Sequence, residues 1–468
     1  MKKLIICWLS LLPLAGIGQD SLNVRVLFHW EEDTIPPSSL IDNPYNEIWG
    51  YTDSVGNEYA IIGSSVGTHI FDVTDAVNSH EVVFVPGRIQ GPSLIHRDFH
   101  DYDQYLYIVA DEGMSSLQIA DLRFLPDSAP LVYDSDSLIR QSHNIFIDVV
   151  GKKLYTCGGV SKMHNSTILT TNHLSVFSLE NPVKPELLVN CRLELGFWNT
   201  IAYVHDIYVQ NDTAYCHAGT KGFFIVDFSD TSDIQLIGSL TQYPQQGYNH
   251  SGWLSPNSSI YAMSDETWGM DMKILDISDL NNIQVIDTIG SDMHPLAMSH
   301  NLIFRENYLF VSHFVDGLYI FDLSDPHNIV LAGYYDTSTR PHESQKWEGA
   351  WGVYPFLSSG KVLISDMQTG LWVLDASDAI TLDRAELPEI ATPSPFPNPF
   401  TDQVGFRFSG NTDGCFLSLT DLRGRIIATV TAAPGQKSIA LDLPIPPGMY
   451  VWSIRTKDEI YSGKLVKH

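Results

Sequence analysis

The sequence predicts an all-β protein, a seven-bladed β-propeller followed by a small C-terminal β-sandwich. A short apolar motif that ends in aspartate recurs along the chain, most clearly at 223–230 (FFIVDFSD) and 318–325 (LYIFDLSD). The copies end 46 to 57 residues apart, at Asp72, Asp121, Ser178, Asp227, Asp276, Asp322 and Asp375. A period near fifty residues, in segments rich in Ile, Val, Phe and Tyr, is typical of propeller blades. A change of composition after residue 387 marks a second domain.

The first element, residues 1–18, has the pattern of a secretory signal peptide. Two lysines precede an apolar stretch at 4–14, and Gly16-Ile17-Gly18 supplies small residues for cleavage before Gln19. The apolar stretch is too short to span a bilayer, and no other window reaches that length. We therefore expect an exported chain without a transmembrane segment.

Residues 19–387 are predicted to form the propeller. In the sixth repeat, strands at 299–304, 308–312, 318–323 and 329–335 alternate with polar turns, which describes one four-stranded antiparallel blade. The same order recurs from Asn46, His96, His143, His205, His250, His300 and Trp351, so the count is seven. The seventh repeat ends soon after Asp375. We expect residues 22–30 to supply its missing strand and close the ring, which leaves few exposed edges.

Residues 388–400 read as a Pro-rich linker, and residues 401–468 read as a domain of alternating strands. The strands are predicted at 404–408, 416–419, 426–430, 438–443 and 450–455. The segments FPNPF at 396–400, LTDLRGR at 419–425 and PGMY at 447–450 resemble the C-terminal sorting domain of the type IX secretion system. That resemblance implies passage through the type IX machinery, with the passenger released or tethered to surface lipopolysaccharide. The alternative is an ordinary carbohydrate-binding sandwich.

The repeats themselves resemble LVIVD repeats. With SSVGTHIFD at 64–72, HRDF at 96–99 and MSDE at 263–266, the array from about residue 45 to 378 is similar to the choice-of-anchor B family. That resemblance implies an exported propeller with no established reaction. Trp268 stands where a histidine is expected in this family, which puts any role of that position in doubt.

The net charge limits the possible binding partners, and the spacing of the cysteines limits the possible zinc and disulfide sites. A formal net charge of −28 argues against binding nucleic acid or an anionic membrane, because phosphates need a positive surface. The cysteines outside the signal, Cys157, Cys191, Cys216 and Cys415, match no zinc or disulfide framework and are predicted to be buried thiols. Cys157 and Cys216 are one position out of register in adjacent repeats, so we expect them to point to opposite sheet faces.

Histidines open the first strand of five repeats. Because the first strand of a blade lines the central channel, and the turn after the second strand lies at the same end, we expect histidines and carboxylates to gather at one mouth. The predicted metal ligands are His96, His143, His205, His250, His300 and Asp265. The predicted ligand-binding residues are His96, Arg97, His217, Glu266, His313, Trp351 and Asp366.

This gathering permits three interpretations. Imidazole and carboxylate together suit a divalent metal ion, or the mouth binds a polar ligand, or the histidines perform acid–base chemistry. Alternatively, each histidine is structural and hydrogen-bonds the neighbouring turn, so that it stays bonded within its own blade. The leading hypothesis is a non-enzymatic surface-displayed or secreted module that binds a ligand or protein. The alternative is a metal-dependent extracellular hydrolase or lyase. The aspartates that end the repeated motif read as turn formers, with calcium binding as their alternative role.

Overall fold

The computed structural model describes residues 21–163, 166–380, 394–396, 403–407, 415–421, 425–432, 438–455 and 460–467. The chain divides into two compact units, Met1–Ile380 and Thr381–His468. The expected signal peptide and most of the expected Pro-rich linker lie outside the described residues. Within those residues, no helix has both the length and the apolar composition needed to span a membrane.

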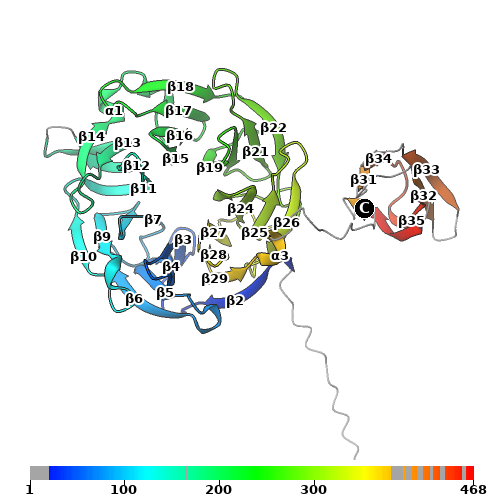
Figure 1. Cartoon of the computed structure of the whole chain (residues 1–468), viewed down its shortest axis with the longest axis horizontal. Coiled ribbons are helices and arrows are strands. Elements are labelled where there is room, and N and C mark those ends of the chain that lie inside the picture. The colour runs from blue at the N-terminus through cyan, green and yellow to red at the C-terminus, as the bar shows by residue number, and fades with distance from the viewer. Residues whose placement is uncertain are drawn as a thin grey trace, which may run out of the picture. The chain divides into compact units, whose positions relative to one another are not determined.

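The described strands of the first unit form seven antiparallel sheets, each built around four strands, and Figure 1 shows them arranged in a ring. The first three sheets are β3 (Tyr45–Thr52), β4 (Glu58–Ser64), β5 (Gly67–Asp72) and β6 (His80–Pro86); β7 (Arg97–Tyr102), β8 (Tyr105–Ala110), β9 (Leu117–Asp121) and β10 (Leu131–Ser135); and β11 (Ile139–Asp148), β12 (Lys153–Lys162), β13 (Leu169–Ser178) and β14 (Glu186–Asn190). The next two are β15 (Asp206–Gln210), β16 (Thr213–His217), β17 (Phe223–Asp227) and β18 (Gln235–Leu240); and β19 (Asn249–Leu254), β20 (Ile260–Asp265), β21 (Met272–Asp276) and β22 (Gln284–Ile289).

The last two sheets take strands from both ends of the unit. The sixth contains β23 (Leu302–Arg305), β24 (Tyr308–His313), β25 (Gly317–Asp322) and β26 (Val330–Tyr335), and β1 (Ser21–Leu22) adds a fifth strand beside β26. The seventh contains β27 (Ala350–Tyr354), β28 (Lys361–Asp366), β29 (Gly370–Asp375) and β2 (Arg25–Trp30). Short helices occur at η1 (Ala76–Asn78), η2 (Leu122–Phe124), α1 (Cys191–Glu194), α2 (Trp198–Ile201) and α3 (Ser377–Ile380).

Pairing between the two ends of the unit closes the ring. Strand β2 pairs antiparallel with β29, and Arg25 lies opposite Asp375 with an ion pair of 2.6 Å. The innermost strand of the seventh sheet, β27, packs against β3, the innermost strand of the first. The predicted closing strand at 22–30 is therefore confirmed. The additional pairing of β1 with β26 was not predicted.

The aspartates of the repeated motif form turns, as the sequence predicts. The carboxylates of Asp227, Asp276 and Asp322 each accept a hydrogen bond from the backbone N–H two residues further on, at 2.8 to 2.9 Å. These side-chain bonds stabilise the turn between the third and fourth strands of each sheet.

The apolar cores lie between neighbouring sheets. One core between the third and fourth sheets contains Cys157, Cys191 and Cys216, all free thiols with no exposed surface. Cys157 and Cys216 meet in this core from the facing sides of two adjacent sheets, consistent with their one-residue difference in register. Burial raises the pKa of all three thiols, so they are inert components of the core.

The second unit is also built of strands. One sheet contains β30 (Ser394–Phe396), β31 (Gln403–Arg407) and β34 (Ser438–Asp442), and the other contains β33 (Ile426–Ala432), β32 (Cys415–Asp421), β35 (Gly448–Arg455) and β36 (Ile460–Lys467). Its own core includes Phe406, Leu419, Trp452 and Leu465. The five predicted strands of this region correspond to β31 through β35.

Candidate metal centre in the central channel

Five histidines and one tryptophan form a closed ring of side chains around the channel. They come from the innermost strands of six successive sheets, or from the one or two residues that precede those strands. The ring centroids of neighbouring side chains are 4.1 to 5.3 Å apart in the order His96, His143, His205, His250, His300, Trp351 and back to His96. We call this set the histidine ring. The repeat therefore places equivalent residues so that they converge on one another.

Contacts within the histidine ring cross from sheet to sheet. Nε2 of His143 lies 3.0 Å from Nε2 of His205, and Nδ1 of His143 lies 2.8 Å from a carboxylate oxygen of Asp111. Nδ1 of His205 lies 3.2 Å from the hydroxyl of Tyr248, and Nδ1 of His300 donates to the carbonyl oxygen of Trp351 at 2.6 Å. These four contacts join each histidine to a neighbouring sheet or to the loop beside it, whereas His250 and Glu266 belong to one sheet.

Most of these imidazoles are neutral near pH 7. Burial lowers the pKa of His96, His205 and His250 well below 6.5 and that of His300 to about 3. His143 differs. Burial alone would lower its pKa, but the hydrogen bond and charge of Asp111, with the charge of Glu266, outweigh burial and raise it. A neutral imidazole offers a lone pair to a metal ion, which a protonated one does not.

Three residues at this mouth can act together as metal ligands. One ligand atom from each of His205, His250 and Glu266 lies within 4.8 Å of the other two. Nε2 of His250 is 3.8 Å from Oε2 of Glu266, and Nδ1 of His250 is buried without a hydrogen-bond partner. Oε1 of Glu266 accepts a hydrogen bond of 2.9 Å from the Trp347 indole. We call this set the mouth triad.

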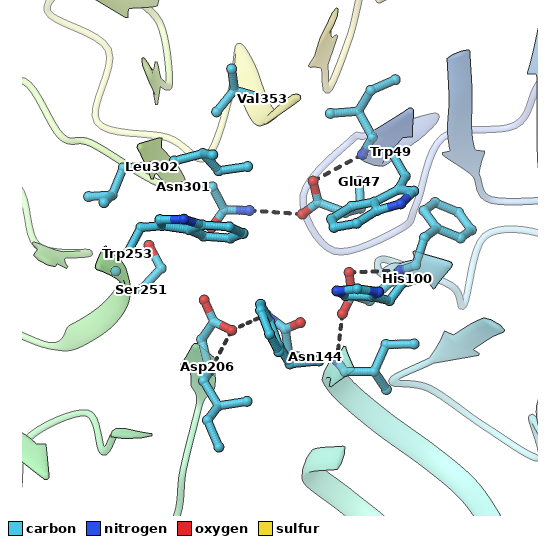
Figure 2. Close-up of a pocket in the computed structure, with 18 residues that line it drawn as sticks. Glu47, Trp49, His100, Asn144, Asp206, Ser251, Trp253, Asn301, Leu302 and Val353 are labelled. Atoms are coloured by element: carbon cyan, nitrogen blue, oxygen red, sulfur yellow. Dashed lines mark hydrogen bonds between the residues drawn. The ribbon is translucent and has the colours of Figure 1, made fainter. Parts of the chain in front are cut away.

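A second layer lies beside the histidine ring: Asp98 and Asp206 follow His96 and His205 by two residues and by one, and Glu47 comes from β3, which carries no member of the ring. It contains three carboxylates, Glu47, Asp98 and Asp206, which line a cavity in the channel (Figure 2). Burial raises the pKa of Glu47 and Asp206 to about 7 and that of Asp98 well above its usual range. Their hydrogen-bond donors are neutral: the backbone amides of Ile48, Phe99, Ile145 and Ile207 and the side-chain amides of Asn144 and Asn301.

Aromatic side chains form a third layer beyond the carboxylates. Trp49, His100, Phe146 and Trp253 line the inner cavity and also a wider hollow of about 330 Å³ outside it, which Phe356 borders. The inner cavity of about 60 Å³ has room for a few water molecules or an ion. The shared lining indicates that the inner cavity opens toward this hollow, at the side of the carboxylates away from the histidine ring.

The structure brings together only part of the predicted site. His96, His143, His205, His250, His300, Trp351 and Glu266 meet in the histidine ring or beside it. The other predicted residues, Arg97, His217, Asp265, His313 and Asp366, are buried within or between sheets. For Arg97, which follows His96 directly, the geometric reason is alternation, because neighbouring residues of a strand point to opposite faces.

Their contacts explain why these five residues are placed elsewhere. Arg97 donates to the carbonyl oxygens of Ser64 and Ile89, and His217 bonds Asn249 and Tyr261. Asp265 pairs with the fully buried Lys273 at 2.6 Å, His313 lies 3.2 Å from Asp316, and Asp366 accepts hydrogen bonds from Thr337, Gln368 and Thr369. The expected metal role of Asp265 and the expected ligand roles of the other four do not fit this geometry.

Sequence reasoning missed the carboxylate layer as a site. The signal was the polar residue that follows several of the histidines, such as Asn144, Asp206 and Asn301. Tyr248 and Trp347, which contact His205 and Glu266, come from loops outside the repeat and have no periodic signal.

Two known families match parts of the chain. The secretion system C-terminal sorting domain matches residues 394–468, and the LVIVD repeat matches residues 202–242 and 298–337. A comparison with curated proteins gave no match. Among solved structures, the chain is similar to the computationally designed Ika8 protein, with 10% identity and a TM-score of 0.43 over 72% of this chain and 98% of that one.

The matched repeats coincide with two of the seven sheets, the fourth (β15–β18) and the sixth (β23–β26). The matched sorting domain coincides with the strands of the second unit. This combination fits the choice-of-anchor B family. The chain therefore contains LVIVD repeats in its propeller, and its C-terminal sorting domain indicates export by the type IX secretion system to the cell surface or the extracellular space.

Proposed function

We propose that this exported propeller is a binding module that holds a divalent transition-metal ion in the mouth triad of His205, His250 and Glu266. The observation that carries the proposal is the convergence of these three ligand atoms within 4.8 Å. Two imidazoles and one carboxylate are a ligand set that suits zinc, iron and similar ions.

Protonation favours a cation over an anion at this mouth. His205 and His250 are neutral because burial lowers the pKa of both. Neutral imidazoles donate electron pairs to a metal ion and attract an anion only weakly, and Nε2 of His250 is the nitrogen that lies 3.8 Å from Oε2 of Glu266. The strongly acidic chain also attracts cations over long range.

Three protein ligands leave at least one coordination position open. An extracellular ligand with a carboxylate or imidazole group would complete the ion's coordination, so the ion would mediate binding. The same open position also supports the second candidate, a metal-dependent hydrolase or lyase, because catalytic zinc sites keep three protein ligands and one water. Hydrolysis or elimination by the zinc-loaded full chain, lost in Glu266→Gln, would favour this second candidate.

Metal analysis of the exported chain tests the proposal. After treatment with a chelator, the chain is titrated with Zn²⁺ and the bound ion is counted by calorimetry and elemental analysis. We expect His250→Gln and Glu266→Gln to weaken binding at this site by at least tenfold. His327→Gln, which changes an exposed histidine in a turn, serves as the matched control and should bind as the unaltered chain does. Unchanged zinc binding in both triad variants would overturn the proposal.

A further inference from the structure

The cavity between the histidine ring and the aromatic layer combines several buried acids, and no lysine or arginine is among the described residues that line it. Glu47 and Asp98 are 7% and 5% exposed, and Asp206 faces the same cavity. An ionised carboxylate buried without a positive partner is strongly destabilising, so this cavity favours either protons or a cation.

A histidine nitrogen adds a ligand of a different kind to these acids. One ligand atom from each of Glu47, His96 and Asp98 lies within 4.8 Å of the other two. The His96 side chain belongs to a residue only 4% exposed, and its Nδ1 is buried without a hydrogen-bond partner. A histidine that groups with two carboxylates and has a buried nitrogen without a partner is an arrangement that a missing ligand would satisfy.

The surrounding bonds hold the carboxylates in place while leaving lone pairs free. Glu47 accepts from the Asn301 side chain at 2.8 Å and from its neighbouring backbone N–H at 3.0 Å. Asp98 accepts from the backbone N–H groups of Phe99 at 2.8 Å and Ile145 at 2.6 Å. Each carboxylate oxygen can accept a second partner, so the neutral donors orient the acids without neutralising them.

We propose that Glu47, His96 and Asp98 bind a second divalent cation inside the channel, at a site separate from the mouth triad. Two carboxylates balance the charge of a divalent ion, and the mixed oxygen and nitrogen ligands suit an ion such as Mn²⁺. Glu47 and Asp98 line the cavity of about 60 Å³, which has room for a few water molecules or an ion and shares its lining with the aromatic hollow, so the hollow gives a route to the site.

Manganese binding to the full exported chain tests this site. The mouth triad is first disabled by His250→Gln and Glu266→Gln together, so that one remaining site is measured. Electron paramagnetic resonance counts free Mn²⁺ during a titration, and thermal unfolding reports stabilisation of the folded chain by the bound ion. We expect one Mn²⁺ per chain and a rise in Tm with Mn²⁺ concentration.

Isosteric amides then remove the charge with little change of shape. Adding Glu47→Gln or Asp98→Asn to the disabled background should weaken Mn²⁺ binding at least tenfold and abolish the rise in Tm. Asp279→Asn, which changes an exposed turn residue, is the control and should change neither Mn²⁺ binding nor the rise in Tm. If one amide variant fails to fold, the other variant still tests whether the inner site binds Mn²⁺.

The outcomes separate the two sites. Absence of bound Mn²⁺ in the triad-disabled chain, or binding that persists unchanged in a folded Glu47→Gln or Asp98→Asn variant, would overturn the inner site and leave the mouth triad standing. Loss of zinc from the mouth with retention of Mn²⁺ in the channel supports two independent sites.

Discussion

Nδ1 of His217 lies 2.9 Å from Oδ1 of Asn249, although the two residues belong to neighbouring sheets. Because a carboxamide oxygen only accepts, Nδ1 carries the proton, and Nε2 accepts from the Tyr261 hydroxyl, also at 2.9 Å. Both nitrogens of this fully buried imidazole are therefore occupied, and burial lowers its pKa to about 3. By contrast, His96 and His250 each keep a buried nitrogen without a partner. This difference distinguishes His217 from His96 and His250.

We predict that His217→Ala destabilises the propeller without affecting metal binding. The substitution leaves the buried Asn249 and Tyr261 groups without a partner, at a cost of about 1–3 kcal/mol for each. The expected result is a fall in Tm of several degrees with an unchanged zinc content. His250→Gln should behave in the opposite way. A His217→Ala chain that melts normally but no longer binds zinc would contradict the assignment.

The closing strand gives a second prediction. Removal of residues 19–30 takes β1 and β2 away and leaves β26 and β29 with unpaired edges. We expect Tm to fall by well over the few degrees that one buried contact contributes, and unfolding to become less cooperative in a calorimetric scan.

Arg25→Ala is the control for that deletion. It removes the ion pair with Asp375 but leaves the strand pairing intact, and the Arg25 side chain is 65% exposed. Exposed ion pairs contribute little, so Tm should not change measurably. A deletion variant as stable as the unaltered chain would show that β2 is not needed for closure.

The pair of Asp316 and His342 predicts a pH-dependent stability. Nδ1 of His342 lies 2.7 Å from Asp316, and this hydrogen bond raises the pKa of His342. Burial alone would raise the pKa of Asp316, but its hydrogen bonds to the neighbouring histidines and Ser291 outweigh burial and hold it below its usual range. Asp336, whose pKa burial raises to about 6, lies 3.9 Å from the other side of His342.

The two shifts act in different pH windows. Because the pKa of His342 is raised in the folded chain, His342 stabilises the fold below about pH 6.5, and this stabilisation is lost as the pH rises through the pKa of His342 in the folded chain. Because the pKa of Asp316 is lowered, Asp316 stabilises the fold above about pH 3.8. Both contributions are present between these values. We therefore expect His342→Gln to lower Tm at pH 5.5 and to leave Tm nearly unchanged at pH 9. His327→Gln serves as the control. An equal fall in the Tm of His342→Gln at pH 5.5 and at pH 9 would count against the ion pair.

The sorting domain gives the last prediction. Because the second unit has its own core and divides from the propeller at Ile380, a chain that ends at residue 392 should keep the Tm of the propeller. It should accumulate in the periplasm, since the matched sorting domain is gone. Mass spectrometry of the full-length protein after export should find neither residues 1–18 nor the final strands. An intact C-terminus on extracellular protein would contradict this expectation.

The sequence alone determined the order of the sheets, the closing strand and the route of export. These features depend on local patterns: an apolar motif that repeats near every fifty residues, an unpaired segment at 22–30, and the terminal motifs of the sorting domain. The histidine ring was also predictable, because residues at the same point of each repeat occupy equivalent positions in space.

Only the tertiary structure decided which acids join those histidines. Asp265 and Glu266 are neighbours in sequence, yet Asp265 pairs with Lys273 inside the fifth sheet and Glu266 reaches His250. Irregular pairing near the start of β3, β19 and β27 shifts the register by a residue or more, so spacing from a histidine does not fix which face a side chain occupies. Long-range packing across the ring, rather than any local pattern, brings Glu47 to His96 and Asp98.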